Sequence, residues 1–180
     1  MIWPFDIAAS GLTDGQVSLR EYRCADAEEL FEALRDDRAW EHIPREIPRD
    51  AAEFDARVRA GLPGLERAAF TIRQRERVVG GTSIFYDPAT PGGVEIGATQ
   101  FDPAVWGTGV NTRAKHLLMR EIFARGADWI QFRTDERNGR SAAAIRKLGA
   151  TDLGVRQDDL VRRDGSVRRS RWFRLDRPAG

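Results

Sequence analysis

The spacing of apolar residues along the chain predicts strands and helices that alternate. Alternation of apolar and polar residues, or short apolar runs between turn residues, predicts strands over 15–22, 67–74, 78–86, 93–101 and 129–134. Apolar positions three and four residues apart predict helices over 25–37, 51–61, 112–125 and 140–149. Two more apolar runs, 153–161 and 166–175, flank the turn sequence RRDG and predict a closing hairpin.

The order of these elements indicates the fold class. Strands joined by short turns pair antiparallel, and each helix must bury its apolar face against the sheet. No internal repeat and no low-complexity linker divides the 180 residues, a length typical of one domain. We therefore expect an α+β (mixed α/β) fold with a mostly antiparallel sheet covered by helices, in a single domain over 1–180.

The content of charged residues, cysteine and histidine limits the partners and cofactors that we expect. The 29 basic and 28 acidic residues leave a formal net charge of +1, so nucleic acid is not an expected partner. The arginine-rich segment 156–177 is interpreted as the solvated face of the closing hairpin, with RNA contact as the alternative. The single cysteine and two histidines show no metal-ligand spacing, so no metal is expected.

Sequence length and apolar runs also bear on location. No run approaches the roughly 20 apolar residues of a membrane span. The first residues lack the basic region of a signal peptide. We expect a cytoplasmic protein with no membrane partner, and the sequence leaves its oligomeric state open, a homodimer included.

A glycine-rich turn, WGTGVNT (106–112), joins the predicted strand 93–101 to the helix that follows. Gly107 and Gly109 let the backbone curl tightly and let a ligand approach closely. Unpaired N–H groups and the helix dipole favour an anion there, most often phosphate. An ordinary strand-to-helix connection explains the glycines alone equally well. The Walker loop lacks its lysine after Gly109, and the dinucleotide fingerprint G-x-G-x-x-G has Thr112 at its third glycine.

Two spaced motifs are more specific than the glycines. The stretch VEIGATQFDPAVWGTGVNTRAK (94–115) joins a strand, a loop and a helix, and RTDERNGRSAAAIRKLGA (133–150) contains N-x-x-S-x-x-x-[IV]-x-K-x-G. Together with the closing strand pair they resemble the GNAT superfamily of acyl-CoA N-acyltransferases, in particular the branch that acetylates the N-termini of ribosomal proteins. The resemblance implies a twisted, mostly antiparallel sheet of about seven strands with helices on both faces. It also implies that strand 93–101 splays from strand 129–134 at the coenzyme A site.

The resemblance implies acetyl-CoA, or another acyl-CoA, as co-substrate. Pantetheine would pair with the backbone near Thr99 and Phe101, as an added strand does. Asn138 would bond the pantetheine amides or, in the alternative interpretation, cap a helix. The pyrophosphate would lie on the loop residues Trp106, Gly107, Thr108, Gly109, Val110, Asn111 and Thr112.

The catalytic residues are less well defined by the resemblance. Many members of the superfamily have a tyrosine general acid where Ile145 stands, and a Gln or Arg where Ala104 stands. Ser141 is therefore the candidate proton donor to the leaving thiolate, and a first-turn serine that bonds only backbone is the alternative. Glu95 is the candidate base for the amine, and a surface or arginine-paired glutamate is the alternative.

The acceptor side of the site is expected in the proline-interrupted segment 38–50. There Trp40 and His42 are candidate acceptor contacts, with packing the favoured role for Trp40. The function predicted is transfer of an acetyl or other short acyl group from acyl-CoA to a primary amine, either a small amine or a protein N-terminus. A non-catalytic coenzyme A-binding or sensor protein of the same fold is the second hypothesis, and a nucleic-acid-associated protein is the third.

Overall fold

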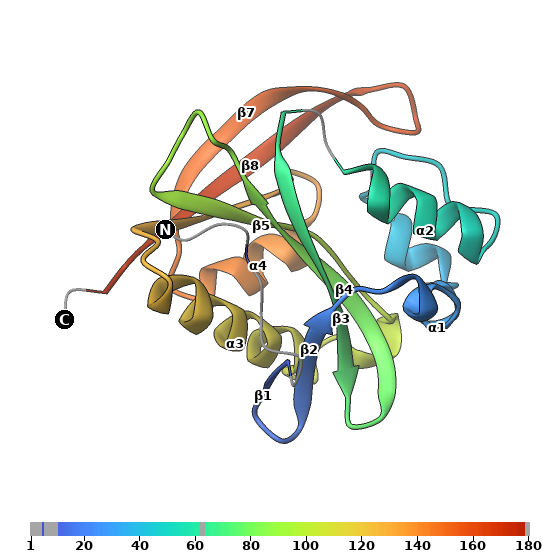
Figure 1. Cartoon of the computed structure of the whole chain (residues 1–180). Helices are drawn as coiled ribbons and strands as arrows, with labels where there is room; N and C mark the ends of the chain where they lie inside the picture. Colours follow the sequence, from blue (N-terminus) through green and yellow to red (C-terminus); the bar gives the residue numbers. More distant parts are fainter. Residues whose placement is uncertain (1–4, 6–10, 62–63, 179–180) are drawn as a thin grey trace.

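The computed structural model of the chain describes residue 5 and residues 11–61 and 64–178. Its strands form one eight-stranded sheet in the spatial order β1-β2-β3-β4-β5-β6-β8-β7 (Figure 1). The strands are β1 (Leu12–Thr13), β2 (Val17–Glu21), β3 (Glu66–Gln74), β4 (Arg77–Tyr86), β5 (Gly93–Phe101), β6 (Trp129–Asp135), β7 (Thr151–Val161) and β8 (Val167–Asp176). The helices are α1 (Ala27–Ala33), α2 (Ala51–Ala60), α3 (Val110–Ala124) and α4 (Gly139–Arg146), with short 3-10 turns η1 (Cys24–Asp26), η2 (Asp37–Trp40) and η3 (Pro103–Val105). None of the helices in this described part has the length and apolar character to cross a membrane.

The sheet opens between its two central strands. Neighbouring strands pair antiparallel except β5 and β6, which run parallel. Their registered pairs run only from Gly93 opposite Trp129 to Glu95 opposite Gln131. Both strands continue beyond that point without pairing to each other, β5 to Phe101 and β6 to Asp135. This divergence is the splay that the resemblance implies.

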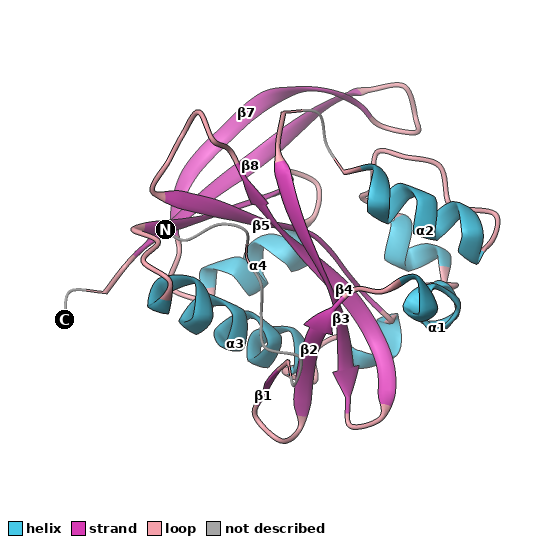
Figure 2. Cartoon of the chain, viewed as in Figure 1, coloured by secondary structure: helices cyan, strands magenta, loops and turns pink. Residues whose placement is uncertain are grey.

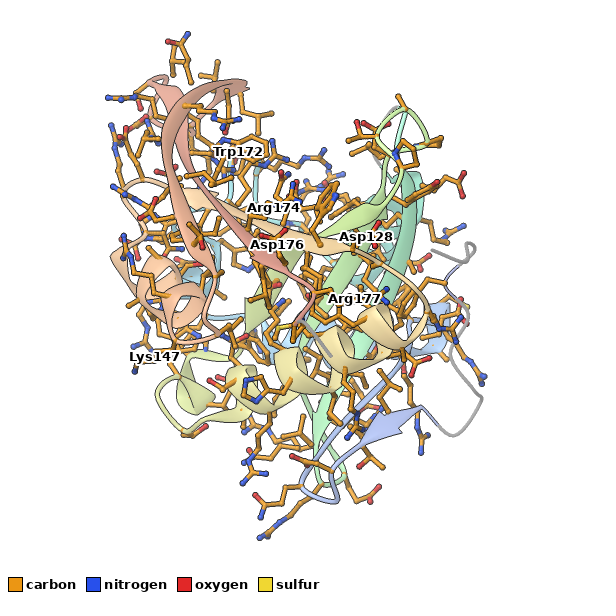
Figure 3. All side chains as sticks on the ribbon, turned by 90° about the vertical axis from the view of Figure 1, so that its left-hand side faces the viewer. Asp128, Lys147, Trp172, Arg174, Asp176 and Arg177 are labelled. Carbon is orange, nitrogen blue, oxygen red and sulfur yellow. The ribbon has the colours of Figure 1, made fainter. Side chains whose placement is uncertain are left out.

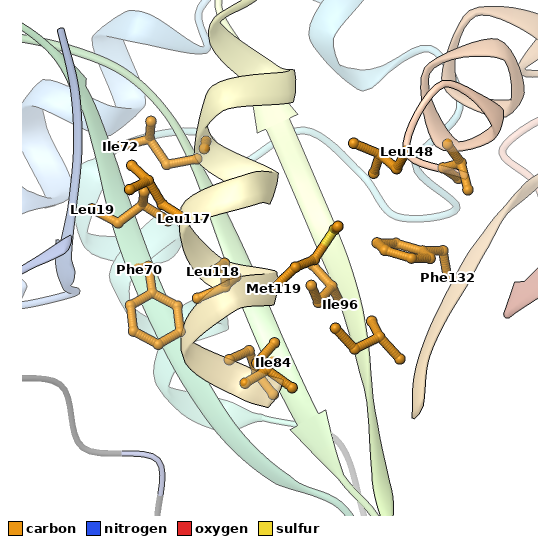
Figure 4. Close-up of a cluster of buried hydrophobic side chains, with 14 of the residues drawn as sticks. Leu19, Phe70, Ile72, Ile84, Ile96, Leu117, Leu118, Met119, Phe132 and Leu148 are labelled. Carbon is orange, nitrogen blue, oxygen red and sulfur yellow. The ribbon is translucent and has the colours of Figure 1, made fainter. Parts of the chain in front are cut away.

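Helices cover both faces of the sheet, as Figures 1 and 2 show. The larger core lies under α3 and α4, where apolar helix residues meet the sheet (Figure 4). Its members include Leu19, Phe70, Ile72, Ile84, Ile96, Leu117, Leu118, Phe132 and Leu148. A smaller core lies under α1 and α2 and contains Leu30, Leu34, Trp40, Phe54 and Val78. The two cores hold the splayed strands between them.

The predicted elements are confirmed with small shifts at their ends. The helix expected over 112–125 begins at Val110. The one expected over 25–37 is split into η1 and α1 and ends at Ala33, four residues earlier than expected. The sheet has eight strands rather than about seven, because Leu12–Thr13 pairs with β2 as a short edge strand. Two residues carry too little alternation to be recognised as a strand. The closing hairpin β7–β8 belongs to the same sheet as the rest.

Candidate active site

The splay is prepared by a bulge in β5. The register between β4 and β5 shifts between Gly81 and Ser83, and Ala98 stands opposite that shift with φ of 45°. A non-glycine residue in the left-handed region is uncommon and costs roughly 1 kcal/mol or more, so the surrounding structure must hold it. Bulges re-aim neighbouring side chains and end regular pairing. Here the bulge lies just past Glu95, the last β5 residue paired with β6.

One cavity, of about 1330 Å³, follows the splay. Its walls come from the turn before α3, the diverging parts of β5 and β6, the start of α4, the α1–α2 connection and the β7–β8 hairpin. Coenzyme A is a long molecule, so a cleft that follows the splay between β5 and β6 suits it better than a compact pocket.

The turn before α3 offers backbone donors to this cavity. Gly107 and Gly109 have φ of 78° and 88°, and no atom of the described residues lies within 4 Å of a Cβ added at either position. Gly109 is the N-cap of α3, and no side chain in the described part of the protein caps this helix. Within the described part of the chain, the N–H groups of Gly107, Gly109 and residues 110–112 have no acceptor. Five unpaired donors at the positive end of a 15-residue helix fit a diphosphate.

Thr108 and Val110 differ from the other residues of this loop. The Thr108 N–H and hydroxyl both donate to the Val105 carbonyl, at 3.3 and 2.7 Å. The Thr108 amide is therefore not available to a ligand, and neither Thr108 nor Val110 lines the cavity. Val110 is buried in the core, so only its backbone can serve the loop.

Trp106 fixes the outer rim of the loop. Its indole N–H donates to the Phe101 carbonyl at 3.3 Å, which ties the loop to the end of β5. The Arg140 guanidinium lies 3.3 Å from the ring centroid, and that of Arg38 lies at 5.9 Å. Two cations on one indole place positive charge beside the amide-lined turn, and this favours a polyanionic ligand there.

Lys115 lies beneath the splay and was not among the candidates drawn from the sequence. Its ammonium donates to the hydroxyls of Thr82 and Thr99, at 3.0 and 2.6 Å, and these hydroxyls lie 2.7 Å apart. Burial lowers the pKa of Lys115 to about 7, and no carboxylate in the described residues pairs with it. Thr99 therefore has its side chain turned to α3, and only its backbone remains for pantetheine.

Glu95 lies where the paired part of β5 ends, with its side chain 17% exposed. Burial raises the pKa of its carboxyl, and the Arg133 guanidinium at 3.5 Å and the Gln131 amide at 3.4 Å only partly oppose this. The arginine-paired alternative is thus realised, but the pair faces the cavity rather than bulk solvent. A carboxylate whose pKa is raised toward neutrality suits a general base.

The far wall of the cavity is formed by charged side chains of the last two strands. Asp158 of β7 accepts from Ser170 and lies 3.4 Å from Arg168 and 3.9 Å from Arg133. Arg133 also lies over Trp172 of β8, at 5.0 Å from the ring centroid. Figure 3 shows Trp172, Arg174 and Asp176 along β8. Much of the arginine-rich segment is thus used in ion pairs within the chain.

The start of α4 combines capping with exposure to the cavity. The Asn138 Oδ1 atom accepts from the Ser141 N–H at 2.9 Å, so Asn138 is the N-cap of this helix. Its amide nitrogen has no acceptor among the described residues, so capping and a bond to pantetheine are compatible. The Ser141 hydroxyl likewise has no partner within the described part, and Ser141 lines the cavity.

Trp40 and His42 both border the cavity, but they differ in their bonds. Trp40 is 5% exposed, packs edge-on against Phe54 and donates its indole N–H to the Leu34 carbonyl at 2.7 Å. Its polar atom is used internally, which agrees with packing as its favoured role. His42 is more open, and burial lowers the pKa of its imidazole, which favours the neutral form, while Glu41 at 3.7 Å opposes this shift. No group of His, Cys, Asp and Glu in the described residues is placed to hold a metal ion.

Several residues of the site could not be found from sequence. Arg38, Arg67, Lys115, Arg133 and Arg140 line the cavity from five different elements. With 29 lysines and arginines along the chain, no single one stands out in the sequence. Only Lys115 could have been singled out from the sequence, because it is one of two lysines and lies on the apolar side of a predicted helix.

Comparison with known proteins agrees with this architecture. A family model described as an acetyltransferase (GNAT) domain matches residues 16–151. Among solved structures, a probable GNAT-family acetyltransferase from Chromobacterium violaceum superposes with a TM-score of 0.85 at 23% identity, over 98% of this chain and 92% of that one. No curated protein sequence matches the chain.

Two more distant structures are similar in fold. The acetyltransferase that modifies the N-terminal serine of ribosomal protein L7/L12 in Salmonella typhimurium has a TM-score of 0.78 at 16% identity, over 91% of this chain and 96% of that one. Spermidine N-acetyltransferase from Vibrio cholerae, in complex with CoA and spermine, has a TM-score of 0.72 at 12% identity, with the same coverage of 91% and 96%.

The fold and the site together define an acyl-CoA-dependent N-acetyltransferase. The family model spans well over half of the sequence, and the sheet, the splay and the turn before α3 agree with it. The chain belongs to the GNAT acetyltransferase family. Members of this family transfer an acyl group from acyl-CoA to an amine, as the two motifs predicted.

Proposed function

We propose that this enzyme acetylates a primary amine, either a small amine or a protein N-terminus, by direct attack of the amine on the thioester of acetyl-CoA. The observation that carries the proposal is the set of N–H groups at Gly107, Gly109 and residues 110–112 that have no acceptor among the described residues, in a turn that lines the same cavity as Glu95. The loop would hold the diphosphate, and the splay would hold pantetheine along β5. We also propose that residues 1–180 form one catalytic domain, because the closing hairpin belongs to the same sheet as the other strands and lines the cavity.

The residues of this chain divide the reaction between them. Acetyl-CoA supplies the activated acyl group. Glu95, directly or through water, would take the proton that the amine loses as its nitrogen bonds to the carbonyl carbon. The carbon–sulfur bond then breaks, and Ser141, directly or through water, would give a proton to the thiolate. The proton held by Glu95 would replace it through water, so both side chains regain their starting states. The products are an N-acetyl amine and free coenzyme A, so atoms and charges balance.

The acceptor must reach Glu95 as a neutral amine. An α-amine has a pKa of roughly 8 and a lysine amine one of about 10.4. An α-amine therefore needs less help from a base at neutral pH than a lysine side chain does. His42 and the cavity wall around it would contact the body of the acceptor.

Two measurements test this proposal together. Calorimetry should detect binding of acetyl-CoA at micromolar concentration or tighter. Thiol release with a panel of primary amines should then exceed the rate without amine. If the protein binds acetyl-CoA but no amine increases the release of thiol, the proposed acetyl transfer is rejected, and a non-catalytic coenzyme A-binding protein is the remaining interpretation.

A further inference from the structure

A row of three residues crosses the floor of the cavity, on adjacent strands. Arg67 of β3 stands opposite Phe85 of β4, and Phe85 stands opposite Glu95 of β5. Residues directly opposite each other in antiparallel strands point to the same face. Neighbouring strands lie about 4.8 Å apart, so the backbones at Arg67 and Glu95 are separated by roughly 10 Å. The row runs from a cation, over an aromatic ring, to the candidate base.

Arg67 is held firmly at its end of the row. Its Nε atom donates to the Ser83 hydroxyl at 2.9 Å, and its Nη1 atom donates to the Val58 carbonyl at 2.7 Å. The guanidinium carbon lies 5.5 Å from the centroid of the Phe85 ring. The Nη2 atom has no acceptor within the described part of the chain. Arg67 lines the cavity, so its Nη2 atom is the donor that remains for a ligand.

This charge lacks the partner that most cavity arginines have. Arg57 pairs with Glu53, Arg133 with Glu95, and Arg168 with Asp158. In the described residues no carboxylate lies within ion-pair distance of Arg67. Burial lowers its pKa, and the nearby Arg45 adds further positive charge. A half-buried guanidinium without an anion is costly, and a ligand carboxylate would offset that cost with charge-assisted hydrogen bonds.

We propose that the acceptor is an amine that also carries a carboxylate, which Arg67 binds. The inference rests on the proposed function, since it places the amine at Glu95 and the carboxylate across the Phe85 ring. The apolar ring between the two charges suits a short chain of methylenes. A polyamine would instead bring a second cation toward Arg67, which electrostatic repulsion disfavours.

The proposal can be tested with pairs of acceptors that differ only in whether they carry a carboxylate or the neutral carboxamide. The first arm compares β-alanine, 4-aminobutanoate and 6-aminohexanoate with their carboxamides. The second arm compares the tripeptide amides Ser-Asp-Ala and Ser-Asn-Ala, so that a small amino acid and an acidic protein N-terminus are distinguished. We expect kcat/KM to be at least tenfold higher for the acid in one arm. Equal rates for acid and amide in both arms would overturn the proposal.

Substitution of Arg67 locates the effect. Arg67→Met should raise KM for the preferred acid at least tenfold and lower kcat/KM for its amide far less, while Arg67→Lys should restore part of the loss. The amide rate reports whether the variant is folded, and Arg35→Met, at an exposed position just after α1, is the matched control. A loss for acid and amide alike would show a structural role and reject the anion site.

The two proposals can fail separately. If no amine is acetylated, the proposed function fails. Binding of a carboxylate-containing amine then tests separately whether Arg67 forms an anion site. Calorimetry of 4-aminobutanoate and of Ser-Asp-Ala amide with coenzyme A-loaded protein should show heat for one of them that Arg67→Met removes. Absence of binding by both probes, or binding that Arg67→Met leaves intact, would overturn the inference about Arg67.

Discussion

The Nζ atom of Lys115 lies 2.6 Å from the Oγ1 atom of Thr99, at the level of the bulge in β5. Lys115 also bonds Thr82 on the neighbouring strand, so one side chain of α3 ties β4 and β5 together where their register shifts. The ammonium is buried without a carboxylate in the described residues. A charge in such a place must cost stability, and the bulge beside it forms the wall of the active-site cleft.

Lys115→Met should stabilise the protein in a pH-dependent manner. Between pH 7 and 10.5 the unfolded chain keeps a proton on Lys115 that the folded chain has released, so the contribution of Lys115 to the free energy of unfolding rises with pH. The slope for one group is at most about 1.4 kcal/mol per pH unit. The variant should gain most below pH 7, and its advantage should shrink toward pH 10 in chemical denaturation. The exposed Lys147, labelled in Figure 3, gives the control Lys147→Met, and a pH-independent difference for Lys115→Met would contradict this account.

Gly109→Glu should abolish binding of acetyl-CoA while the chain stays folded. A side chain here has open space around it, but its charge would stand at the amides and repel the diphosphate. The left-handed φ of 88° costs any other residue roughly 1–2 kcal/mol. Gly165→Glu is the matched control, because Gly165 has a φ of 80°, equally open surroundings and no place in the cavity. Calorimetry should find normal affinity in the control and none in Gly109→Glu; equal affinity in the two would show that the loop is only a turn.

Glu95→Gln should lower kcat/KM by about a hundredfold, the scale of general-base catalysis. The raised pKa of Glu95 places the loss of its proton closer to neutral pH than for an ordinary glutamate. In the wild type kcat/KM should therefore rise with pH across that ionisation, and the rise should disappear in the glutamine variant. Glu76→Gln, in the β3–β4 turn, is the control. A variant that keeps the wild-type pH profile would remove Glu95 from the mechanism.

Ser141→Ala should reduce kcat roughly tenfold and leave the KM for acetyl-CoA nearly unchanged, because the hydroxyl is expected to act on the departing thiolate. Ser141→Thr keeps the hydroxyl and should restore most of the rate. Steady-state assays of thiol release measure both constants. If alanine and threonine behave alike, the residue only packs at the first turn of α4.

Much of the fold could be predicted because its signals are local. The strand over 93–101 and the helix over 51–61 follow directly from periodicity and turn residues, and the structure places them within one residue of those bounds. The edge strand β1 was not predicted, because two residues are too few to show an alternation of apolar and polar positions. The backbone donors of the loop were also predictable, since glycine positions and a helix start determine them.

The side-chain part of the site could not be predicted in the same way. The pairing of Arg67 with Phe85 and Glu95 depends on the register of three strands, which sequence alone does not give. The same holds for Lys115, whose partners Thr82 and Thr99 come from two strands far away in sequence. For Thr108 the prediction from sequence was too generous. Its place in the loop suggested a free N–H group, but that group donates to the Val105 carbonyl within the turn.

A crystal structure grown with excess acetyl-CoA would show whether the turn before α3 binds the diphosphate. We expect diphosphate oxygens within hydrogen-bond distance, about 2.7–3.2 Å, of the N–H groups of Gly109 and residues 110–112, with the thioester beside β5 near Glu95. A coenzyme bound elsewhere, or a turn whose amides keep to internal acceptors in the complex, would contradict this expectation.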